Sequence, residues 1–265
     1  MFKRAFIEQR GMGRNGREET MVAEECQRLE IEVVPFTAKQ IHRRQLPLSD
    51  ETFICGDMVA MHGAMKQLGI EVPIPDDFPA VLEPFLKRRV WRSTVSALEA
   101  ALDQGRETFA KPAGRSKVFT GRVFGSPYDR SYLSGISRRE PIWCSEVVDW
   151  ISEYRVYVIE SEIVSIDYYW GDRSVPVSLS TVQEAVKLYS CSGKSPVAYG
   201  IDFGVLSSGE TALVEANDGY ALGAYSINAT DYTRLLLARW RQLLDSRILA
   251  KADSSSCSPF VDPVV

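Results

Sequence analysis

Histidine is scarce in this chain, and its scarcity limits the chemistry to be expected. The 265 residues contain only two histidines, His42 and His62, which lie in different segments. A histidine-based catalytic triad, or a zinc site with several imidazole ligands, is therefore not expected. We interpret both histidines as structural or surface residues.

Cysteine pairs with metal-binding spacing are also missing. Five cysteines are scattered along the chain without a Cys-x-x-Cys pair: Cys26, Cys55, Cys144, Cys191 and Cys257. An odd number at wide spacing is typical of free thiols in a reducing compartment. The N-terminus lacks the apolar core of a signal peptide, so the sequence predicts a cytoplasmic protein.

The chain has neither an excess of positive charge nor a long apolar run. Its formal net charge is -4 and its pI is about 5.4, which argues against a general binder of nucleic acids. No apolar run is long enough to span a bilayer. We expect neither a nucleic acid nor a membrane as a partner.

Polar residues interrupt an otherwise apolar stretch at residues 213–217. The apolar residues there predict a buried strand, and Glu215 and Asn217 break the pattern two residues apart. Side chains two apart in a strand point to the same face. A carboxylate and an amide oxygen are therefore expected to project together.

A second predicted strand, residues 197–206, carries a further acid, Asp202. A turn centred on Ser208 and Gly209 would set Asp202 directly against Glu215. Like charges directly opposed on a sheet are destabilising, whereas two carboxylates and an amide suit a hard cation such as Mg²⁺. The alternative is a set of polar residues on a solvated sheet face.

The N-terminal region contains a glycine pattern between a predicted strand and a predicted helix. Gly11, Gly13 and Gly16 spell G-x-G-x-x-G after a strand at residues 3–9, and a second strand is expected at 31–36. This is the context of a dinucleotide-binding turn, but the acid that binds ribose is missing after the second strand. A plain tight turn, or an amide-lined pocket for a substrate carboxylate, is an alternative.

A proline-rich segment at residues 72–84 indicates a connection between domains. A strand at 51–56 and a helix at 58–68 complete a small open α/β domain before it. We therefore predict an N-terminal α/β domain at 1–83, a larger domain at 84–252 and a flexible tail at 253–265.

Two basic segments follow. The cluster at residues 87–92 is interpreted mostly as the solvated face of a helix, although one of its cations could reach an anion. Lys111 then ends a short strand that leads into a glycine-bearing basic loop with Lys117. Ammonium and amide donors on such a loop suit a polyphosphate, and the alternative is an exposed hairpin loop.

Charged side chains also alternate along a predicted antiparallel meander. A strand at residues 142–148 carries Glu146, and the next, at 153–159, places Glu153 and Arg155 on one face. That face is either solvated or part of a site. A helix opened by Ser180, with Gln183 as its capping-box partner, is expected next, and a last helix at 231–250.

Four segments in this order resemble the ATP-grasp superfamily of ligases: FAKPAGRSKVFTG (109–121), CSEVVDWISEYRVYV (144–158), DFG (202–204) and VEANDGYALG (214–223). The chain is most similar to the uncharacterised clade named for one arginine and two lysines. The resemblance implies an ATP-grasp fold of the α/β (α+β) class. A small N-terminal open α/β domain would precede antiparallel sheets that sandwich the nucleotide.

The resemblance also implies a role for particular residues. ATP phosphates would be held by Lys111, by Lys117 in the closing loop, and by Arg89. Backbone groups of Glu146, Val147 and Val148 would meet the adenine, and Glu153 the ribose hydroxyls. Arg155 would act, together with Lys117, at the transferred phosphate. Asp202, Glu215 and Asn217 would hold Mg²⁺.

The implied activity is that of an ATP- and magnesium-dependent carboxylate-amine ligase with an acyl-phosphate intermediate. Its substrates would be a small-molecule carboxylate and an amine, from an amino acid or a peptide. One alternative is a catalytically silent nucleotide-binding or interaction protein with the same fold. Another is a Rossmann-type oxidoreductase that uses Gly11, Gly13 and Gly16.

Overall fold

The computed structural model describes residues 2–9, 15–114 and 118–256, with the backbone alone described from 248 to 256. Gly11, Gly13 and Lys117 lie outside the described residues. The chain packs into two compact units. Unit 1 contains Met1–Pro73, Pro196–Tyr199 and Gly219–Val265, and unit 2 contains Ile74–Ser195 and Gly200–Asp218. The domain boundaries expected after residues 83 and 252 stay a prediction.

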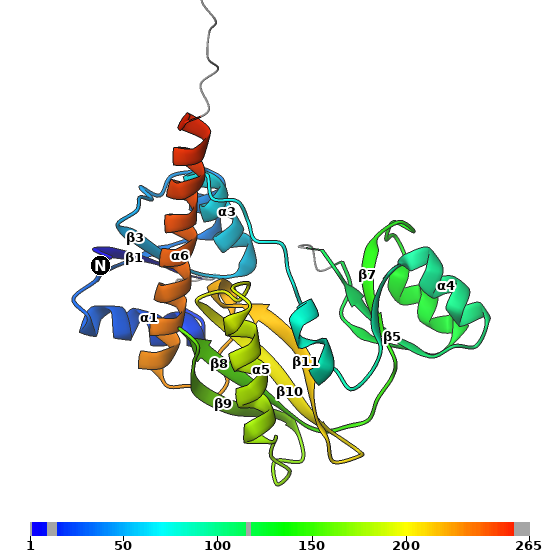
Figure 1. Cartoon of the computed structure of the whole chain (residues 1–265). Coiled ribbons are helices and arrows are strands. Elements are labelled where there is room, and N and C mark those ends of the chain that lie inside the picture. The colour runs from blue at the N-terminus through cyan, green and yellow to red at the C-terminus, as the bar shows by residue number, and fades with distance from the viewer. Residues whose placement is uncertain (1, 10–14, 115–117, 257–265) are drawn as a thin grey trace, which may run out of the picture. The chain divides into compact units, whose positions relative to one another are not determined.

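Unit 1 is built on a three-stranded parallel sheet in the order β2-β1-β3 (Figure 1). Its strands are β1 (Arg4–Glu8), β2 (Glu32–Phe36) and β3 (Thr52–Cys55), and its first helices are α1 (Arg17–Arg28), α2 (Ala38–His42) and α3 (Met58–Leu68). The Asp57 side chain caps α3 by accepting from the amides of Val59 and Ala60, each at 2.9 Å. Gly69 ends this helix with φ 73°, as predicted.

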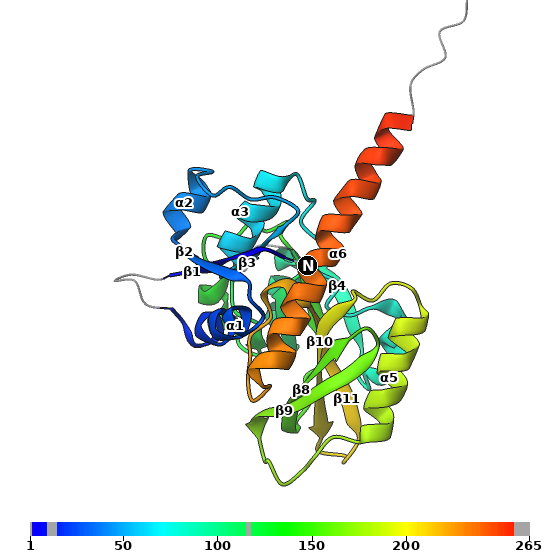
Figure 2. The ribbon, with the colours of Figure 1, turned by 90° about the vertical axis from the view of Figure 1, so that its left-hand side faces the viewer.

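The last helix, α6 (Ala229–Ser256), belongs to unit 1, where it packs on α1 and β3 (Figure 2). Trp240 is 1% exposed, and its Nε1 donates to the Thr52 carbonyl of β3 at 2.9 Å. The helix continues to Ser256, so the tail expected from residue 253 is helical at its start. Among the described residues, no helix combines the length and apolar character needed to cross a membrane.

Replacing Trp240 with phenylalanine is expected to lower the free energy of unfolding by about 2 kcal/mol. The change removes the indole donor and leaves the buried Thr52 carbonyl without it, a loss of about 1–3 kcal/mol. Chemical denaturation would measure the effect. Trp170→Phe is the control because Trp170 is 52% exposed, and its change should stay within about 0.5 kcal/mol. Equal effects of the two substitutions would contradict the assigned role of Trp240.

The first sheet of unit 2 is antiparallel, in the order β4-β7-β5-β6. It contains β4 (Val90–Thr94), β5 (Thr108–Pro112), β6 (Arg122–Phe124) and β7 (Pro141–Ser145), and the helix α4 (Val95–Asp103) begins at the capping residue Thr94. One face of the sheet buries Ala110, Ile142 and Cys144 against Leu98 and Leu102 of α4. This packed face leaves the opposite face of the sheet for polar side chains.

Two sequence-based expectations about this sheet are wrong. Residues 90–94 form strand β4 rather than a helix, because Val90, Trp91 and Thr94 favour a strand and the segment pairs with β7. Strand β7 ends at Ser145 instead of continuing to residue 148. Glu146, Val147 and Val148 therefore lie in the connection between β7 and the next sheet.

The second sheet of unit 2 has the order β11-β10-β8-β9. Its strands are β8 (Trp150–Ile159), β9 (Glu162–Gly171), β10 (Ala198–Leu206) and β11 (Thr211–Asp218). The helix α5 (Leu179–Cys191) begins after Ser178, whose hydroxyl accepts from the Thr181 amide at 3.4 Å, so the cap predicted at Ser180 is wrong. Two short 3-10 helices, η2 (Ala80–Phe85) and η3 (Pro127–Leu133), lie elsewhere in unit 2, and a third, η4 (Gly219–Ala221), follows β11.

The turn between β10 and β11 lies one residue earlier than predicted. The Gly209 amide donates to the Leu206 carbonyl at 2.8 Å, and the Leu206 amide donates to the Glu210 carbonyl at 2.9 Å. The turn is therefore centred on Ser207 and Ser208. Gly209 follows it with φ 86°, a left-handed conformation that glycine adopts without strain.

Candidate functional site

Arg155 and Asp202 form a buried ion pair between the neighbouring strands β8 and β10. Arg155 Nε lies 2.8 Å from Asp202 Oδ1, and Arg155 Nη2 lies 2.7 Å from Oδ2. The two side chains are 11% and 3% exposed. Burial raises the pKa of the Asp202 carboxyl to about 6, while the Arg155 guanidinium acts in the opposite direction. This bidentate geometry fixes both side chains on one face of the sheet.

Glu215 and Asn217 of β11 meet Asp202 on the same face. Asn217 Nδ2 lies 3.2 Å from Glu215 Oε1 and 3.5 Å from Asp202 Oδ2. The sequence predicted that these three side chains gather, and the structure brings them together although the turn that was used to align them is misplaced. The Asn217 amide bridges the two acids, which keeps their like charges apart.

Lys111 of β5 supplies a cation to this group. Its ammonium forms ion pairs with Glu215 and, at 2.9 Å, with Asp77 Oδ2. Burial would raise the pKa of Glu215, but the Lys111 ammonium and the Asn217 amide hold it below the usual value. Burial would likewise lower the pKa of Lys111, yet the Glu215 and Asp77 carboxylates keep it above the usual value. Lys111 therefore remains charged.

Asp77 is a site residue that the sequence did not reveal. Its carbonyl accepts from the Ala216 amide at 2.8 Å, so the segment before η2 runs along β11. Burial raises the pKa of the Asp77 carboxyl, and Lys111 opposes that rise. The proline-rich segment around Asp77 looks like an ordinary connecting loop in the sequence, and nothing in its pattern points to Lys111.

Arg92 is a second residue that the sequence interpretation missed. Trp143 of β7 pairs with Arg92 on one side and with Lys111 on the other, so the three lie in a row on one face of the sheet. The Arg92 guanidinium stacks 4.0 Å from the centre of the Trp143 ring and donates to the Ala113 carbonyl at 3.3 Å. Arg92 and Lys111 thus place two cations on the face opposite α4.

The structure does not bring Arg89 or the Glu146 side chain to Lys111. The Arg89 guanidinium lies 4.7 Å from the ring centre of Trp91, which packs on the α4 side of the sheet. Glu146 Oε2 accepts from the Arg89 amide at 2.9 Å. Arg89, Trp91 and Glu146 line a hollow of about 430 Å³ on that side. Val147 and Val148 lie half-buried in the connection after β7.

Glu153 of β8 lies near the same group of charges and has a partner of its own. Tyr169 of β9 donates to Glu153 Oε2 at 2.6 Å. Burial raises the pKa of Glu153, and the Tyr169 hydrogen bond counteracts this rise. The carboxylate therefore lies on the same sheet face as Arg155, two residues further along β8.

Arg88 is buried rather than solvated, contrary to the expectation for most of the basic cluster. Its Nη1 donates to the Leu213 carbonyl at 2.6 Å, and its Nη2 to the Val214 carbonyl at 3.1 Å. Burial lowers the pKa of Arg88 to about 10, with Glu153 and Glu215 acting in the opposite direction. Arg88 therefore anchors the two residues of β11 that precede Glu215.

The gathered oxygen atoms fit a divalent cation. Asp202, Glu215 and Asn217 carry carboxylate and amide oxygens, the ligands that Mg²⁺ prefers, and a flip of the Asn217 amide would turn its oxygen toward the acids. Here Arg155 and Lys111 balance the two carboxylates. In the described part of the chain, no group of three or more His, Cys, Asp or Glu side chains is placed to hold a metal. The proposed set differs in kind, since it contains only two acids.

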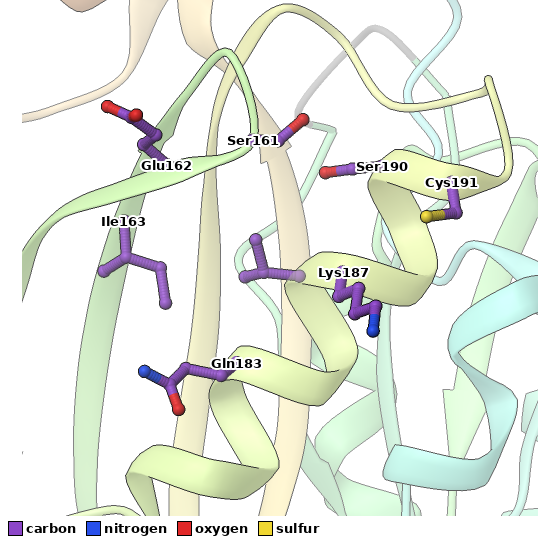
Figure 3. A pocket seen from close by; sticks show the side chains of 8 residues that line it. Ser161, Glu162, Ile163, Gln183, Lys187, Ser190 and Cys191 are labelled. Atoms are coloured by element: carbon purple, nitrogen blue, oxygen red, sulfur yellow. The ribbon is translucent and has the colours of Figure 1, made fainter.

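Another hollow in unit 2, of about 700 Å³, lies away from these residues. Side chains of α5 and of the turn between β8 and β9 line it, including Gln183, Lys187, Ser161 and Glu162 (Figure 3). It contains none of the predicted site residues. We therefore take the group around Lys111 and Glu215 as the candidate site.

A family model for the ATP-grasp domain, the second family of the clade named for one arginine and two lysines, matches residues 85–235. The chain belongs to this family. The match covers more than half of the chain and includes every predicted site residue, and it confirms the resemblance that the four sequence segments indicated. A search of curated proteins finds no significant match.

Solved structures agree on the ATP-grasp fold. D-alanine–D-alanine ligase from Bacillus anthracis complexed with ATP is similar with TM-score 0.55 and 14% identity, covering 94% of this chain and 99% of that one. N5-carboxyaminoimidazole synthase from Aspergillus clavatus gives 0.54 and 15%, covering 92% and 77%. The macrocyclase MdnC from Microcystis aeruginosa, bound with the precursor peptide MdnA, gives 0.51 and 10%, covering 88% and 99%. Such low identities support the fold alone.

Proposed function

We propose that this ATP-grasp protein is an ATP- and magnesium-dependent ligase that joins a carboxylate to an amine. The observation that carries the proposal is the meeting of Lys111 and Arg155 with Asp202, Glu215 and Asn217 in unit 2. A triphosphate and a carboxylate repel each other, so a site that joins them needs fixed cations and a place for a metal. This group of residues offers both.

Each part of ATP has candidate partners in this chain. Lys111 and Arg92 would hold the phosphates, because both lie on the same face of the first sheet. Lys117 is expected to join them from the closing loop. Backbone groups of the connection from Glu146 to Val148 would meet the adenine. Glu153 would accept hydrogen bonds from the ribose hydroxyls.

The reaction needs no nucleophilic side chain. A substrate carboxylate oxygen attacks the terminal phosphorus of ATP, the bond to the bridging oxygen breaks, and ADP leaves. The amine then attacks the carbonyl carbon of the acyl phosphate, loses a proton, and phosphate leaves. Arg155 would face the transferred phosphoryl group, with Lys117 closing over it, and stabilise its charge. Mg²⁺ held by Asp202, Glu215 and Asn217 would neutralise triphosphate charge.

We expect an amino acid or a peptide among the substrates. This expectation is supported by two relatives in fold, a D-alanine–D-alanine ligase and a macrocyclase bound to a precursor peptide. We also expect a cytoplasmic protein, in keeping with four described cysteines that are free thiols: Cys26, Cys55, Cys144 and Cys191. The proposed ATP-grasp domain extends over residues 84–252, after the N-terminal α/β domain at 1–83.

Two measurements test the proposal. Calorimetry should show ATP binding that depends on Mg²⁺, and ATP should be consumed when candidate amino acids or short peptides are added. Absence of magnesium-dependent ATP binding would refute the ligase assignment. Binding without phosphate release across a broad substrate panel would instead favour a silent nucleotide-binding protein. An oxidoreductase is disfavoured by the family match.

Arg92→Leu is expected to weaken ATP binding about tenfold, because a charge-assisted hydrogen bond to phosphate contributes about 1.5–3 kcal/mol. Arg89→Leu is a matched control, since Arg89 lies on the α4 side of the same sheet. Its dissociation constant for ATP should stay within about twofold of the wild type. The opposite ranking of the two variants would assign the phosphate contact to Arg89.

A further inference from the structure

Tyr169 lies at an irregularity of the β8–β9 ladder. Glu153 pairs with Trp170, and Tyr154 pairs with Tyr168, so Tyr169 is left over between two paired positions of β9. Such β-bulges re-aim side chains and are frequent beside active sites. Here the Tyr169 hydroxyl is directed at the Glu153 carboxylate, to which it donates at 2.6 Å.

The hydrogen bond has consequences for the shape of the carboxylate. Burial, the nearby Asp202 and the bond to Glu153 all raise the pKa of Tyr169 well above its usual value, so the phenol keeps its proton and stays a donor. A carboxylate has about four acceptor positions on its two oxygens. Tyr169 uses one of them and restrains the rotation of the Glu153 side chain, which leaves acceptor capacity for further hydroxyl groups.

We propose that Tyr169 is a positioning residue for the ribose of ATP, which it serves by holding Glu153 in the orientation that accepts both ribose hydroxyls. This inference rests on the proposed function, in which Glu153 contacts the ribose. Its consequence is selectivity: the protein prefers a nucleotide with ribose hydroxyls over one without them, and part of that preference depends on Tyr169.

The test is calorimetry with ATP and with 2′,3′-dideoxy-ATP, both in the presence of Mg²⁺. Tyr169→Phe keeps the ring and removes only the hydroxyl, so the fold should persist. We expect ATP affinity to fall about tenfold, as for a lost hydrogen bond to a charged group, and dideoxy-ATP affinity to stay within about twofold. The preference for ATP should therefore shrink about tenfold.

Tyr168→Phe is the matched control. Its hydroxyl donates to the Gly171 carbonyl at 2.5 Å, and its ring packs on Tyr154 with the centres 5.7 Å apart, away from Glu153. This variant should bind both nucleotides like the wild type. Glu153→Gln should lose the same preference as Tyr169→Phe, and the double variant should lose little more, because the two side chains act as one unit.

The outcomes separate the inference from the proposed function. If the wild type binds no ATP with Mg²⁺, the proposed function fails. If it binds ATP but Tyr169→Phe keeps the full preference over dideoxy-ATP, the ligase proposal stands and the positioning role is overturned. Equal losses for both nucleotides would also overturn it, since they indicate a purely structural role. A wild type without any preference would remove both the ribose contact of Glu153 and the role of Tyr169.

Discussion

Glu215→Ala should reduce magnesium-dependent ATP turnover about 10³-fold, because a bound metal contributes several kcal/mol of charge stabilisation in such transfers. The substitution removes one of two carboxylates that meet Asn217. It also leaves Lys111 with one acidic partner fewer. Coupled measurement of phosphate release, over a range of Mg²⁺ concentrations, would show both the loss of rate and a weaker dependence on the metal.

The fold of the Glu215→Ala variant should stay near intact. Lys111 keeps its ion pair with Asp77 at 2.9 Å, so its ammonium is not left alone in a buried position. Glu210→Ala is the control in the same hairpin, since Glu210 is exposed and its oxygen lies 3.8 Å from Lys87 Nζ. This control should keep full activity. Retained activity in Glu215→Ala would remove Glu215 from the metal site.

The alternation of side chains predicted the central part of the site. Glu215 and Asn217 stand two residues apart in an apolar strand, and this spacing alone places them on one face. The adjoining Asp202 could be added because a short turn joins the two strands. The prediction tolerated a turn misplaced by one residue, since long polar side chains still reach one another through the Asn217 amide.

The choice between Arg89 and Arg92 could not be made in the same way. The two residues stand three apart, and an odd separation in a strand puts them on opposite faces. Which face holds Lys111 depends on the pairing of β4 and β5 with Trp143, and this pairing is a long-range property of the sheet. The segment was moreover interpreted as a helix, for which three residues apart means the same face.

Asp77 and Tyr169 were missed for two other physical reasons. Asp77 comes from an irregular segment, and its place beside Lys111 depends on a backbone hydrogen bond to Ala216, far along the chain. Tyr169 belongs to a strand that was predicted, but its aim depends on a bulge that has no signature in the sequence. Elements with a regular period are predictable here, and contacts set by tertiary packing are not.

Arg155→Met should abolish turnover and also destabilise unit 2. Loss of the arginine that faces the transferred phosphoryl group is expected to lower the rate about 10³-fold or more. The same change leaves the buried Asp202 carboxylate, 3% exposed, without its bidentate partner. Removing one member of a buried ion pair costs about 3–5 kcal/mol of stability. Thermal unfolding would therefore report a lower midpoint for this variant.

A double variant separates the two effects of Arg155. In Arg155→Met/Asp202→Asn the uncompensated charge is gone, so much of the stability should return, while turnover should remain lost because both proposed functions of the pair are missing. Arg155→Lys keeps a positive charge beside Asp202 but cannot form the bidentate contact, and it should rank between the wild type and Arg155→Met in stability. If the stabilised double variant regained turnover, Arg155 would act only as the counter-charge of Asp202.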